Sequence, residues 1–517
     1  MANKAIKIYA KEHGGRVSLL FLLFLLSIYQ FISAGFNAFA IVCLSPILVI
    51  LTIAVFRYKT LAFWALICIN YLIQWKSLPA PEGIPVSLYN EMLEIILIAF
   101  AIIDAQEARF ERTANLMLYS LIIWCGFCTL EVLNDTCGIG IDVGGWYTVA
   151  RMMAFQLIYT FIVFSIYISN PQILIKYLYV WGALALFASF WVWKQQKFGF
   201  TNAENAFIQG RGRSTHILQG GTLIRYFSIY SDAANFGIGI ASTAVAFIIF
   251  GITAKIRKYK FFFLTVGVAC TWAMFPSGTR TAIAALMAGF MAYIFLSKSI
   301  KIAVPFSVIF ALFVCMLAFT NIGNGNQSIR RMRSAFNKND ASANQRSINQ
   351  EAMKKYMKEA PWGIGLNIGN VGRQHVPANN KYAFMATVPP DSEYVFIWIH
   401  TGIIGITVFL ICTVIMLMGA CWIVFFTLKS SSLRGIGAGL CCAFVSQQLG
   451  GYGNQVLMQF PNGLVFYGGL SIVYILPYIE NKWIEHENMY LAKQEEKKRR
   501  RLEKKKQSRV KTYLNWM

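Results

Sequence analysis

Charged residues are scarce in this chain of 517 residues. They make up 14% of it, whereas hydrophobic residues make up 57%, and the mean hydropathy is +0.52. A soluble globular domain has about 25% charged residues, so the composition excludes folding in water. Acidic residues are the scarcer kind, with 23 Asp and Glu against 47 Lys and Arg, which gives a net charge of +24. The basic residues lie between apolar segments, so we expect them to set membrane topology and expect no nucleic-acid partner.

The common catalytic and cofactor motifs are also missing. The sequence has no Walker loop, no HExxH, no GxSxG and no zinc-type cluster, and its five histidines are scattered. These absences argue against an ATP-driven pump and a metalloprotease, and we expect neither a metal nor a cofactor. Of the 11 cysteines, only Cys137 is predicted to be exposed, and the others lie in or beside apolar segments. No disulfide framework is therefore expected.

Long apolar runs, in contrast, fill most of the chain. A helix needs about 20 apolar residues to cross the hydrocarbon layer of a membrane. Runs of this kind predict an all-α, polytopic transmembrane bundle of about fourteen helices with a long, partly helical periplasmic loop. The predicted spans are residues 17–34, 37–56, 60–75, 88–104, 115–132, 149–168, 174–193, 233–252, 260–276, 281–298, 302–320, 402–427, 434–449 and 462–481.

The short loops rich in lysine and arginine all fall on one side of this bundle. Lys4, Lys7 and Lys11 place the N-terminus in the cytoplasm, and every short loop that returns to that side is basic. The even number of spans also returns the C-terminus to the cytoplasm. We therefore expect a multi-pass protein of a bacterial inner membrane, with residues 1–481 as the transmembrane domain. Residues 482–517 form a basic cytoplasmic tail that would touch anionic lipid.

Two predicted outward segments are long and yet basic. Residues 194–232 include Arg211, Arg213 and His216, and residues 321–399 carry ten lysines and arginines against five acidic residues. Long loops can be translocated despite positive charge, so the predicted topology stands. The charge nevertheless calls for a functional reason.

The second outward segment has internal order. Residues 347–359 have helical composition, with Met353 and Met357 along one side, and a glycine-rich turn follows. Residues 391–427 are too long for one straight crossing. They therefore predict a short helix over 391–401 that enters the membrane, followed by a span.

Three arginines lie in motif-like contexts at the outer surface. Arg225 opens RYFSIYSDAANFG, Arg280 lies in the Pro/Gly break FPSGTRTA, and Arg346 precedes the loop helix. A guanidinium stays charged and its donors match phosphate oxygens, so three at one depth suit a pyrophosphate at the headgroup level. Each arginine taken singly also has a plainer interpretation, as an interfacial side chain that reaches the headgroups.

The motifs taken in order carry a family resemblance. The succession of RYFSIYSDAANFG, SGTRTAIAAL, QRSINQEAMKKYMKEAPWGIGLNIG and DSEYVFIWIHTGIIGITVF resembles the O-antigen polymerase and O-antigen ligase superfamily over residues 200–428. These are integral-membrane glycosyltransferases of the Wzy/WaaL type, with a GT-C-like fold. The resemblance implies a polyprenyl-diphosphate-linked oligosaccharide as donor, an acceptor sugar, and metal-independent transfer at the periplasmic face.

The resemblance also implies roles for single residues. Arg225 matches the arginine ahead of the family's helix-opening Asp/Pro-Asn element, here Asp232 with Asn235. Arg280 matches the arginine of the Ser-Arg-Thr-like turn, and Arg346 the one ahead of the Pro-x-Gly-x-Gly segment. These arginines would hold the diphosphate as it leaves. The candidate substrate-binding residues are Arg211, Arg213, Asp232, Asn235 and Tyr394.

Attack of a sugar hydroxyl on an anomeric carbon that bears diphosphate needs a stabilised leaving group and a base. Asp391 and Glu393 are candidate bases at the mouth of the predicted site, and His375 is a third. Inversion at the anomeric carbon is the simplest course. Plainer roles stay open for the two acids, as a helix N-cap (Asp391) and a first-turn acid (Glu393). Tyr394 could stack on a sugar ring or anchor the membrane interface.

Three functions compete at this point. The first is a polysaccharide polymerase that joins lipid-diphosphate-linked repeat units, with a chain-length regulator as a candidate partner. The second is a ligase that moves finished glycan to a lipid core. The ligase branch typically has a His-Asn pair where this chain has Asp391-Ser392-Glu393, which favours the polymerase. The third is a flippase or transporter of the same lipid-linked glycan. A structured outer loop is of less use to a transporter, and Glu91, Glu94 and Glu131 are predicted near helix ends rather than in mid-membrane.

Overall fold

The computed structural model describes residues 58–78, 87–104, 109–218, 223–297, 341–368, 376–387 and 391–514, with scattered positions between 18 and 29 and between 304 and 333. Of residues 59, 341–346, 387, 497–498 and 501–514 only the backbone is described. The chain divides by its internal contacts into two units, Met1–Ala65 and Leu66–Met517, and each is described by itself. Nearly all described residues belong to the second unit.

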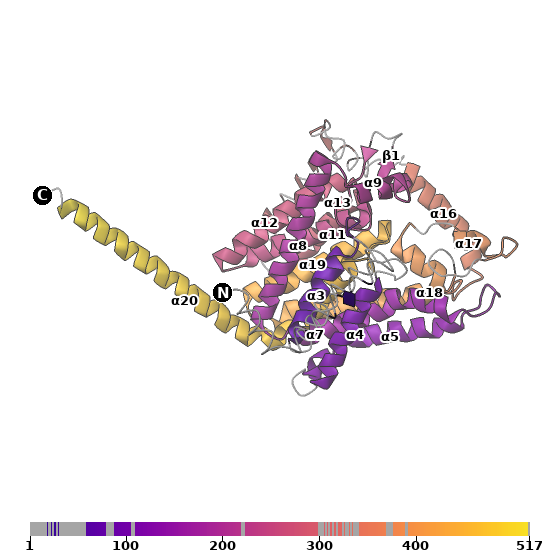
Figure 1. Ribbon diagram of the computed structural model, residues 1–517, viewed down its shortest axis with the longest axis horizontal. Coiled ribbons are helices and arrows are strands. Elements are labelled where there is room, and N and C mark those ends of the chain that lie inside the picture. Colours follow the sequence, from indigo (N-terminus) through magenta and orange to yellow (C-terminus); the bar gives the residue numbers. More distant parts are fainter. Residues whose placement is uncertain are drawn as a thin grey trace. The chain divides into compact units, whose positions relative to one another are not determined.

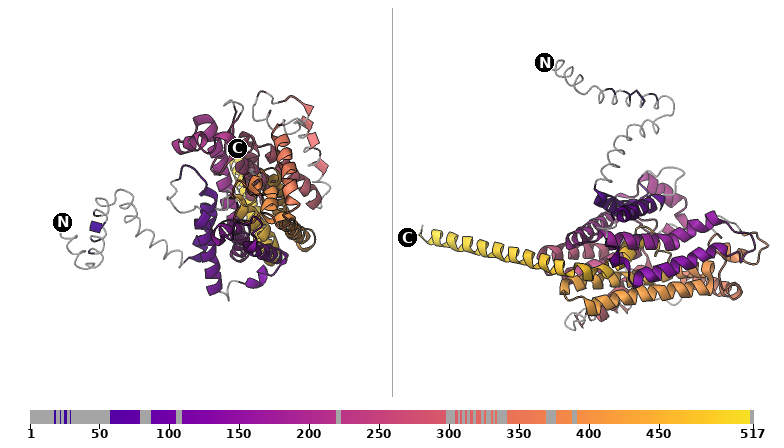
Figure 2. Two further views of the ribbon diagram at one scale, coloured as in Figure 1. Left: turned by 90° about the vertical axis from the view of Figure 1, so that its right-hand side faces the viewer. Right: turned by 90° about the horizontal axis from the view of Figure 1, so that it is seen from below.

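The described part of the chain is mostly helical (Figures 1 and 2). Its α-helices are α3 (Lys59–Leu72), α4 (Ser87–Ile103), α5 (Leu116–Leu130), α6 (Val143–Ala150), α7 (Gln156–Tyr167), α8 (Pro171–Phe198), α9 (Asn202–Gln209), α10 (Arg213–His216), α11 (Ala233–Thr253), α12 (Arg257–Ala273), α13 (Arg280–Leu296), α16 (Ala341–Met357), α17 (Ala383–Thr387), α18 (Glu393–Trp422), α19 (Ser431–Gly453) and α20 (Gly468–Leu514). Two short strands, β1 (Ile217–Leu218) and β2 (Leu223–Ile224), pair antiparallel, with Ile217 opposite Ile224.

Helix α11 is the central element of the second unit. It packs against α8, α12, α13 and α19, and 83% of its most apolar stretch is buried (Figure 1). The helix begins where the Asp232 side chain accepts hydrogen bonds from the backbone N–H groups of Ala234 and Asn235. An acidic N-cap of this kind satisfies donors that the first helical turn leaves unpaired. The start of α11 is therefore fixed at one residue.

Helix α19 lies close to α11 because it is rich in glycine. Gly435 and Gly439 lie one turn apart, and a Cβ on Gly439 would collide with the Phe250 ring of α11. Small residues at this spacing let two membrane helices approach closely and gain van der Waals contact. The low hydropathy of α19 thus reflects burial against protein, since 17 of its residues are buried.

Seven helices in the described part are long and apolar enough to cross a membrane: Leu116–Leu133, Val143–Tyr167, Pro171–Phe198, Ala233–Thr253, Arg257–Ser277, Glu393–Thr427 and Gly463–Glu496. Each coincides with a predicted span. Shorter helices cover the predicted spans at 60–75, 88–104 and 281–298, and α19 covers 434–449. The predicted spans at 17–34, 37–56 and 302–320 lie largely outside the described residues. The chain is a multi-pass helical membrane protein.

The two outward segments of the prediction have defined structure where they are described. Residues 199–224 form α9, α10 and the strand pair. In the second segment the predicted loop helix is confirmed as α16, which buries Met353 and Met357 against Ile364, Tyr382 and other apolar side chains. Cys137 belongs to the same apolar cluster and is 5% exposed, so the prediction that it is exposed was wrong. The polar residues next to Cys137 in the sequence gave no indication that it packs against α16 and the turn that follows it.

The predicted break between the short helix 391–401 and the span that follows it is confirmed as a kink in α18. Gly402 has φ 68° and ψ −170°, which separates a short helix from the long span that follows. The turn after α16 crosses α18 here, because Ile364 N–H donates to the Ile399 carbonyl at 2.9 Å. A Cβ on Gly402 would collide with the carbonyl of Pro361. Only glycine combines this φ with so close an approach of backbone.

Substitution Gly402→Ala should destabilise the protein by about 2 kcal/mol or more, because the new methyl group meets backbone and the residue must keep a positive φ. We expect a lower thermal unfolding midpoint for the detergent-solubilised protein. The matched control is Gly126→Ala in α5, where an added Cβ meets nothing within 4 Å. Equal midpoints for the two variants would contradict this account of the kink.

Candidate functional site

Arg225 is anchored on the turn that carries Arg280. It follows β2, and its Nη2 donates to the Thr279 hydroxyl at 2.9 Å while its Nε donates to the Ser277 carbonyl at 3.2 Å. A third bond joins Nη1 to the Thr215 carbonyl at 3.0 Å. Arg280 is the next residue after Thr279 and is the first residue of α13. The structure therefore brings these two sequence-predicted arginines to one turn.

Two helix N-termini meet at this turn. The Thr279 hydroxyl donates to the carbonyl of Ala233 at 2.9 Å, which joins the start of α13 to the start of α11. A helix start carries partial positive charge, and helix N-termini are places where phosphate groups bind. At α11 the first backbone N–H groups are already bonded to His216 and Asp232. Two helices of 17 and 21 residues and two arginines thus concentrate positive potential in a small volume. The arrangement suits a ligand with two phosphate groups.

His216 contributes to the same place in its neutral form. Its Nε2 accepts a hydrogen bond from the Ala233 N–H at 3.2 Å, while its Nδ1 lies 3.0 Å from the Gly212 carbonyl. An imidazole nitrogen can accept only when it carries no proton, so this geometry requires the tautomer protonated at Nδ1. The pKa of His216 is lowered to about 4, mainly by burial; the charge of Asp232 opposes this shift, and nearby Arg225 adds to it. The ring stays uncharged at neutral pH.

A lysine that the sequence analysis did not single out lies nearby. Lys76 follows α3, is half-buried, and places its Nζ 4.6 Å from the centre of the Phe207 ring. Burial lowers its pKa, whereas the charge of Asp232 raises it. Lys76 stands at the end of a predicted span and outside any motif, so no signal in the sequence connected it with Asp232.

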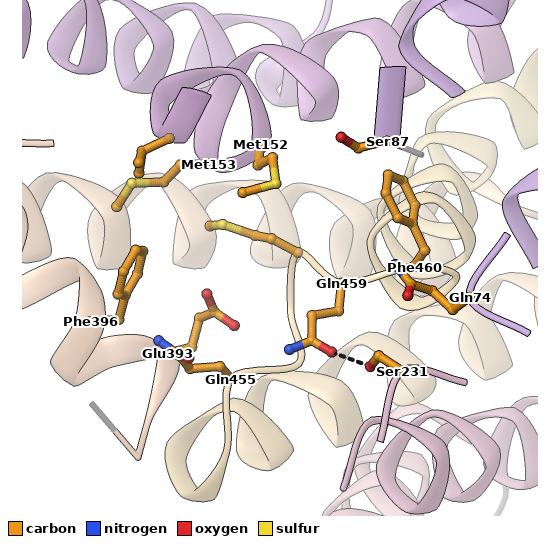
Figure 3. Close-up of a pocket in the computed structure, with 12 residues that line it drawn as sticks. Gln74, Ser87, Met152, Met153, Ser231, Glu393, Phe396, Gln455, Gln459 and Phe460 are labelled. Atoms are coloured by element: carbon orange, nitrogen blue, oxygen red, sulfur yellow. Dashed lines mark hydrogen bonds between the residues drawn. The ribbon is translucent and has the colours of Figure 1, made fainter. Parts of the chain in front are cut away.

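A cavity of about 400 Å³ opens beside this turn (Figure 3). Its polar lining is Gln74, Ser87, Ser231, Glu393, Gln455 and Gln459, and its apolar lining is Val149, Met152, Met153, Phe396, Met458 and Phe460. These residues come from α4, α18, the continuous helical stretch Val143–Tyr167, the segment before α11, and the loops after α3 and α19. Convergent polar groups on a mostly apolar wall are typical of ligand sites.

Ser231 connects the cavity with the turn over Ser277 and Thr279, which binds Arg225 and precedes Arg280 and is called the arginine turn from here on. The Ser231 hydroxyl donates to Gln459 Oε1 at 2.7 Å (Figure 3). It also lies 2.8 Å from Oδ2 of Asp232, which caps α11. The next residue, Ala233, is the one that Thr279 and His216 contact. A short run of hydrogen-bonded groups therefore links the cavity wall to the residues that hold Arg225.

Of the predicted bases, Glu393 lines the cavity. It is the first residue of α18 and 4% exposed, and its Oε2 accepts the Leu457 N–H at 3.0 Å. Asp391 is exposed, and the N-cap position belongs to Ser392, not to Asp391. Glu393 is thus both the first-turn acid and the carboxylate that faces the cavity. The plainer and the functional interpretation of this residue are compatible.

Two candidate substrate-binding residues are engaged within the protein. Tyr394 donates its hydroxyl to Gln448 Oε1 at 2.8 Å. Asn235 is fully buried; its amide nitrogen donates to the Phe460 carbonyl at 2.8 Å and its oxygen accepts from Asn462. Asn235 therefore fastens the segment after α19 to the start of α11. This contact positions Gln459 at the cavity.

The remaining candidates are not brought into the cavity by described contacts. Arg211 and Arg213 flank Gly212 and are exposed. Arg346 lies in α16, but its side chain is outside the described residues, as is all of His375. Among the described residues, no group of three or more His, Cys, Asp and Glu could hold a metal ion.

A buried ion pair supports the cavity from the opposite side. Arg151 donates to Glu91 at 2.8 Å and to the Ser87 hydroxyl at 2.8 Å, and the Ser87 side chain lines the cavity. Both charged side chains are at most 6% exposed. A charge buried in a membrane protein persists when it is paired and hydrogen-bonded. The predicted positions of Glu91 and Glu94 near a helix end gave no indication of this partner 60 residues away.

The comparisons with known proteins agree with the motif order. Residues 263–410 match the Wzy_C family, described as O-Antigen ligase. The match includes Arg280, Arg346, Asp391 and Glu393, and begins after Arg225. No curated protein matches the chain. Residues 263–410 are thus similar to the Wzy_C family, which Wzy polymerases and WaaL ligases share; members of that family are membrane enzymes that transfer glycan units from lipid-linked substrates.

The pH dependence of stability should report the neutral state of His216. Its pKa of about 4 in the folded protein lies below the ordinary value of 6.5, so between these values the unfolded chain binds a proton that the folded protein does not. Stability should fall by roughly 3 kcal/mol as pH drops through this window. We expect the thermal midpoint of the wild-type protein to fall more steeply with decreasing pH than that of His216→Gln, which cannot titrate. Parallel curves would rule out this origin.

Proposed function

We propose that this multi-pass membrane protein, which is similar to the Wzy_C family over residues 263–410, is a polysaccharide polymerase that joins polyprenyl-diphosphate-linked repeat units at the periplasmic face of the inner membrane. One observation carries the proposal: Arg225 and Arg280 meet at two helix N-termini, and a hydrogen-bonded run leads from there to a cavity with a buried carboxylate. A leaving-group site and a base site are the two parts that glycosyl transfer requires.

The turn before α13, which contacts the start of α11, would bind the diphosphate of the donor. As the bond between the anomeric carbon and the diphosphate oxygen breaks, negative charge grows on that oxygen. Arg225 is held in advance by Ser277 and Thr279 at the place where the starts of α11 and α13 meet, and Arg280 is the first residue of α13. These two arginines and the two helix dipoles would stabilise the developing charge. Preorganised donors stabilise a transition state more than water does, because they need not reorient.

Glu393 would take the proton of the acceptor hydroxyl. The hydroxyl oxygen attacks the anomeric carbon, the lipid diphosphate leaves from the opposite face, and the proton passes to the carboxylate, so the product has the inverted configuration. The backbone N–H groups of Leu457 and Val456 hold the carboxylate of Glu393, which lines the cavity where the acceptor would lie. Asp391 and His375 stay as alternative bases.

The polymerase is preferred over the ligase because of the segment that opens α18. The ligase branch has a His-Asn pair there, whereas this chain has Asp391 and Ser392 before the buried Glu393. A carboxylate base with no histidine beside it suits a polymerase of this superfamily. A ligase that acts on a lipid core acceptor is the second candidate.

Deletion of the gene separates these two functions. For a polymerase, we expect cells that display single repeat units in place of long surface glycan, because capping of the core still occurs but joining does not. The readout is the size distribution of surface glycan on gels. Full-length polymer that accumulates on its carrier lipid would instead identify a ligase.

Arg225→Lys and Glu393→Gln should each fail to restore long glycan to the deletion strain. Lysine lacks the planar fork that contacts Ser277 and Thr279, and glutamine cannot accept a proton; loss of one such group lowers rates by about 100-fold or more. Arg257→Lys, at an exposed position of α12, is the matched control and should restore normal glycan. Membrane levels are compared by immunoblot. Normal chain length in either site variant at equal level would refute its assigned role.

A further inference from the structure

The cavity beside Glu393 has a charge pattern that glycosyl transfer by itself does not require. Three glutamines and two serines line it, and Glu393 is the single ionisable side chain among its described lining residues. Arg225 and Arg280 are not among the lining residues, and Arg151, which donates to the lining Ser87, is paired with Glu91. No lysine or arginine is therefore among the described residues that line the cavity.

The three glutamines present hydrogen-bonding groups that the rest of the described chain does not use. Gln74 and Gln455 make no side-chain hydrogen bond with any described residue, and Gln459 uses only its Oε1, toward Ser231. An amide offers both donors and acceptors, as does a hydroxyl. Polar groups on the wall of a cavity that lack a partner among the described residues suit a ligand with many hydroxyls.

The apolar part of the wall complements such a ligand. Phe396 and Phe460 contribute aromatic rings to the wall, and methionines from two segments also line it (Figure 3). A pyranose ring has one face of C–H groups that packs on aromatic and thioether surfaces, while its rim of hydroxyls meets amides. The cavity offers both kinds of surface to one ligand.

We infer that this cavity is a subsite for an uncharged sugar unit, a hexose or an N-acetylated hexosamine, and that it excludes a uronic acid. The inference rests on the proposed function and names the sugar class for it. A uronate carboxylate placed here would face Glu393 without a cationic partner, and a buried charge without a partner is strongly disfavoured. Gln455 and Gln459 are the residues that determine this specificity.

The test uses purified full-length protein in lipid nanodiscs and two probes that differ only at C6, methyl β-glucopyranoside and methyl β-glucopyranosiduronate. Saturation-transfer NMR should detect the glucoside, with the glucuronide bound at least about tenfold more weakly. The double variant Gln455→Ala/Gln459→Ala should weaken glucoside binding by about tenfold, because two hydrogen-bonding groups are lost. The matched control is Gln209→Ala, at an exposed position of α9.

Gln455→Arg provides a test that does not depend on loss of binding. It adds the missing cation, so the preference should shift toward the glucuronide, and this variant decides the question if the double variant is unstable. Equal binding of both probes by the wild-type protein, no binding of either, or an unchanged preference in Gln455→Arg would overturn the inference.

The outcomes also separate the inference from the proposed function. A protein that restores long glycan to the deletion strain but prefers the glucuronide overturns only the inferred sugar class. A protein that prefers the glucoside but whose deletion leaves glycan length unchanged overturns only the polymerase assignment.

Discussion

The hydrogen bond from the Thr279 hydroxyl to the Ala233 carbonyl is the contact on which the candidate site depends. It joins the starts of α11 and α13, and the same hydroxyl accepts the Arg225 guanidinium. Two helix dipoles and two arginines would repel one another if nothing held them, and here a buried threonine, 3% exposed, holds them together. The positive potential that results is a fixed property of the fold, and a diphosphate would neutralise it.

The base side of the site depends on a different set of contacts. Close packing of the glycines of α19 against α11 brings the segment after α19 across the top of α11, and Asn235 and Asn462 fasten it there. This segment supplies Gln455 and Gln459 to the cavity and the Leu457 N–H to Glu393. Loss of one of these amide contacts would therefore disturb the base and the proposed sugar subsite together, while leaving the arginine turn in place.

Separation of charge is the physical theme of this arrangement. Arg225 and Arg280 lie where α11 and α13 start, together with Asp232, which caps α11. The second carboxylate, Glu393, lies at the start of α18, and amides and hydroxyls line the cavity beside it. The one charged pair that supports the cavity wall, Arg151 with Glu91, is neutral overall and uses Ser87 as its contact with the cavity.

The sequence by itself determined the membrane bundle, its spans, the break at Gly402 and the family motifs, because apolar length, glycine and motif order are local properties of the chain. It also selected Arg225, Arg280 and Glu393. Only the tertiary structure decided that Gln74, Lys76, Ser87 and Gln455 belong near them, since these residues come from segments far apart in sequence and carry no motif. The same holds for Asn235, whose amide is used to fasten a loop: which partner a polar side chain finds depends on helix packing, and periodicity does not encode it.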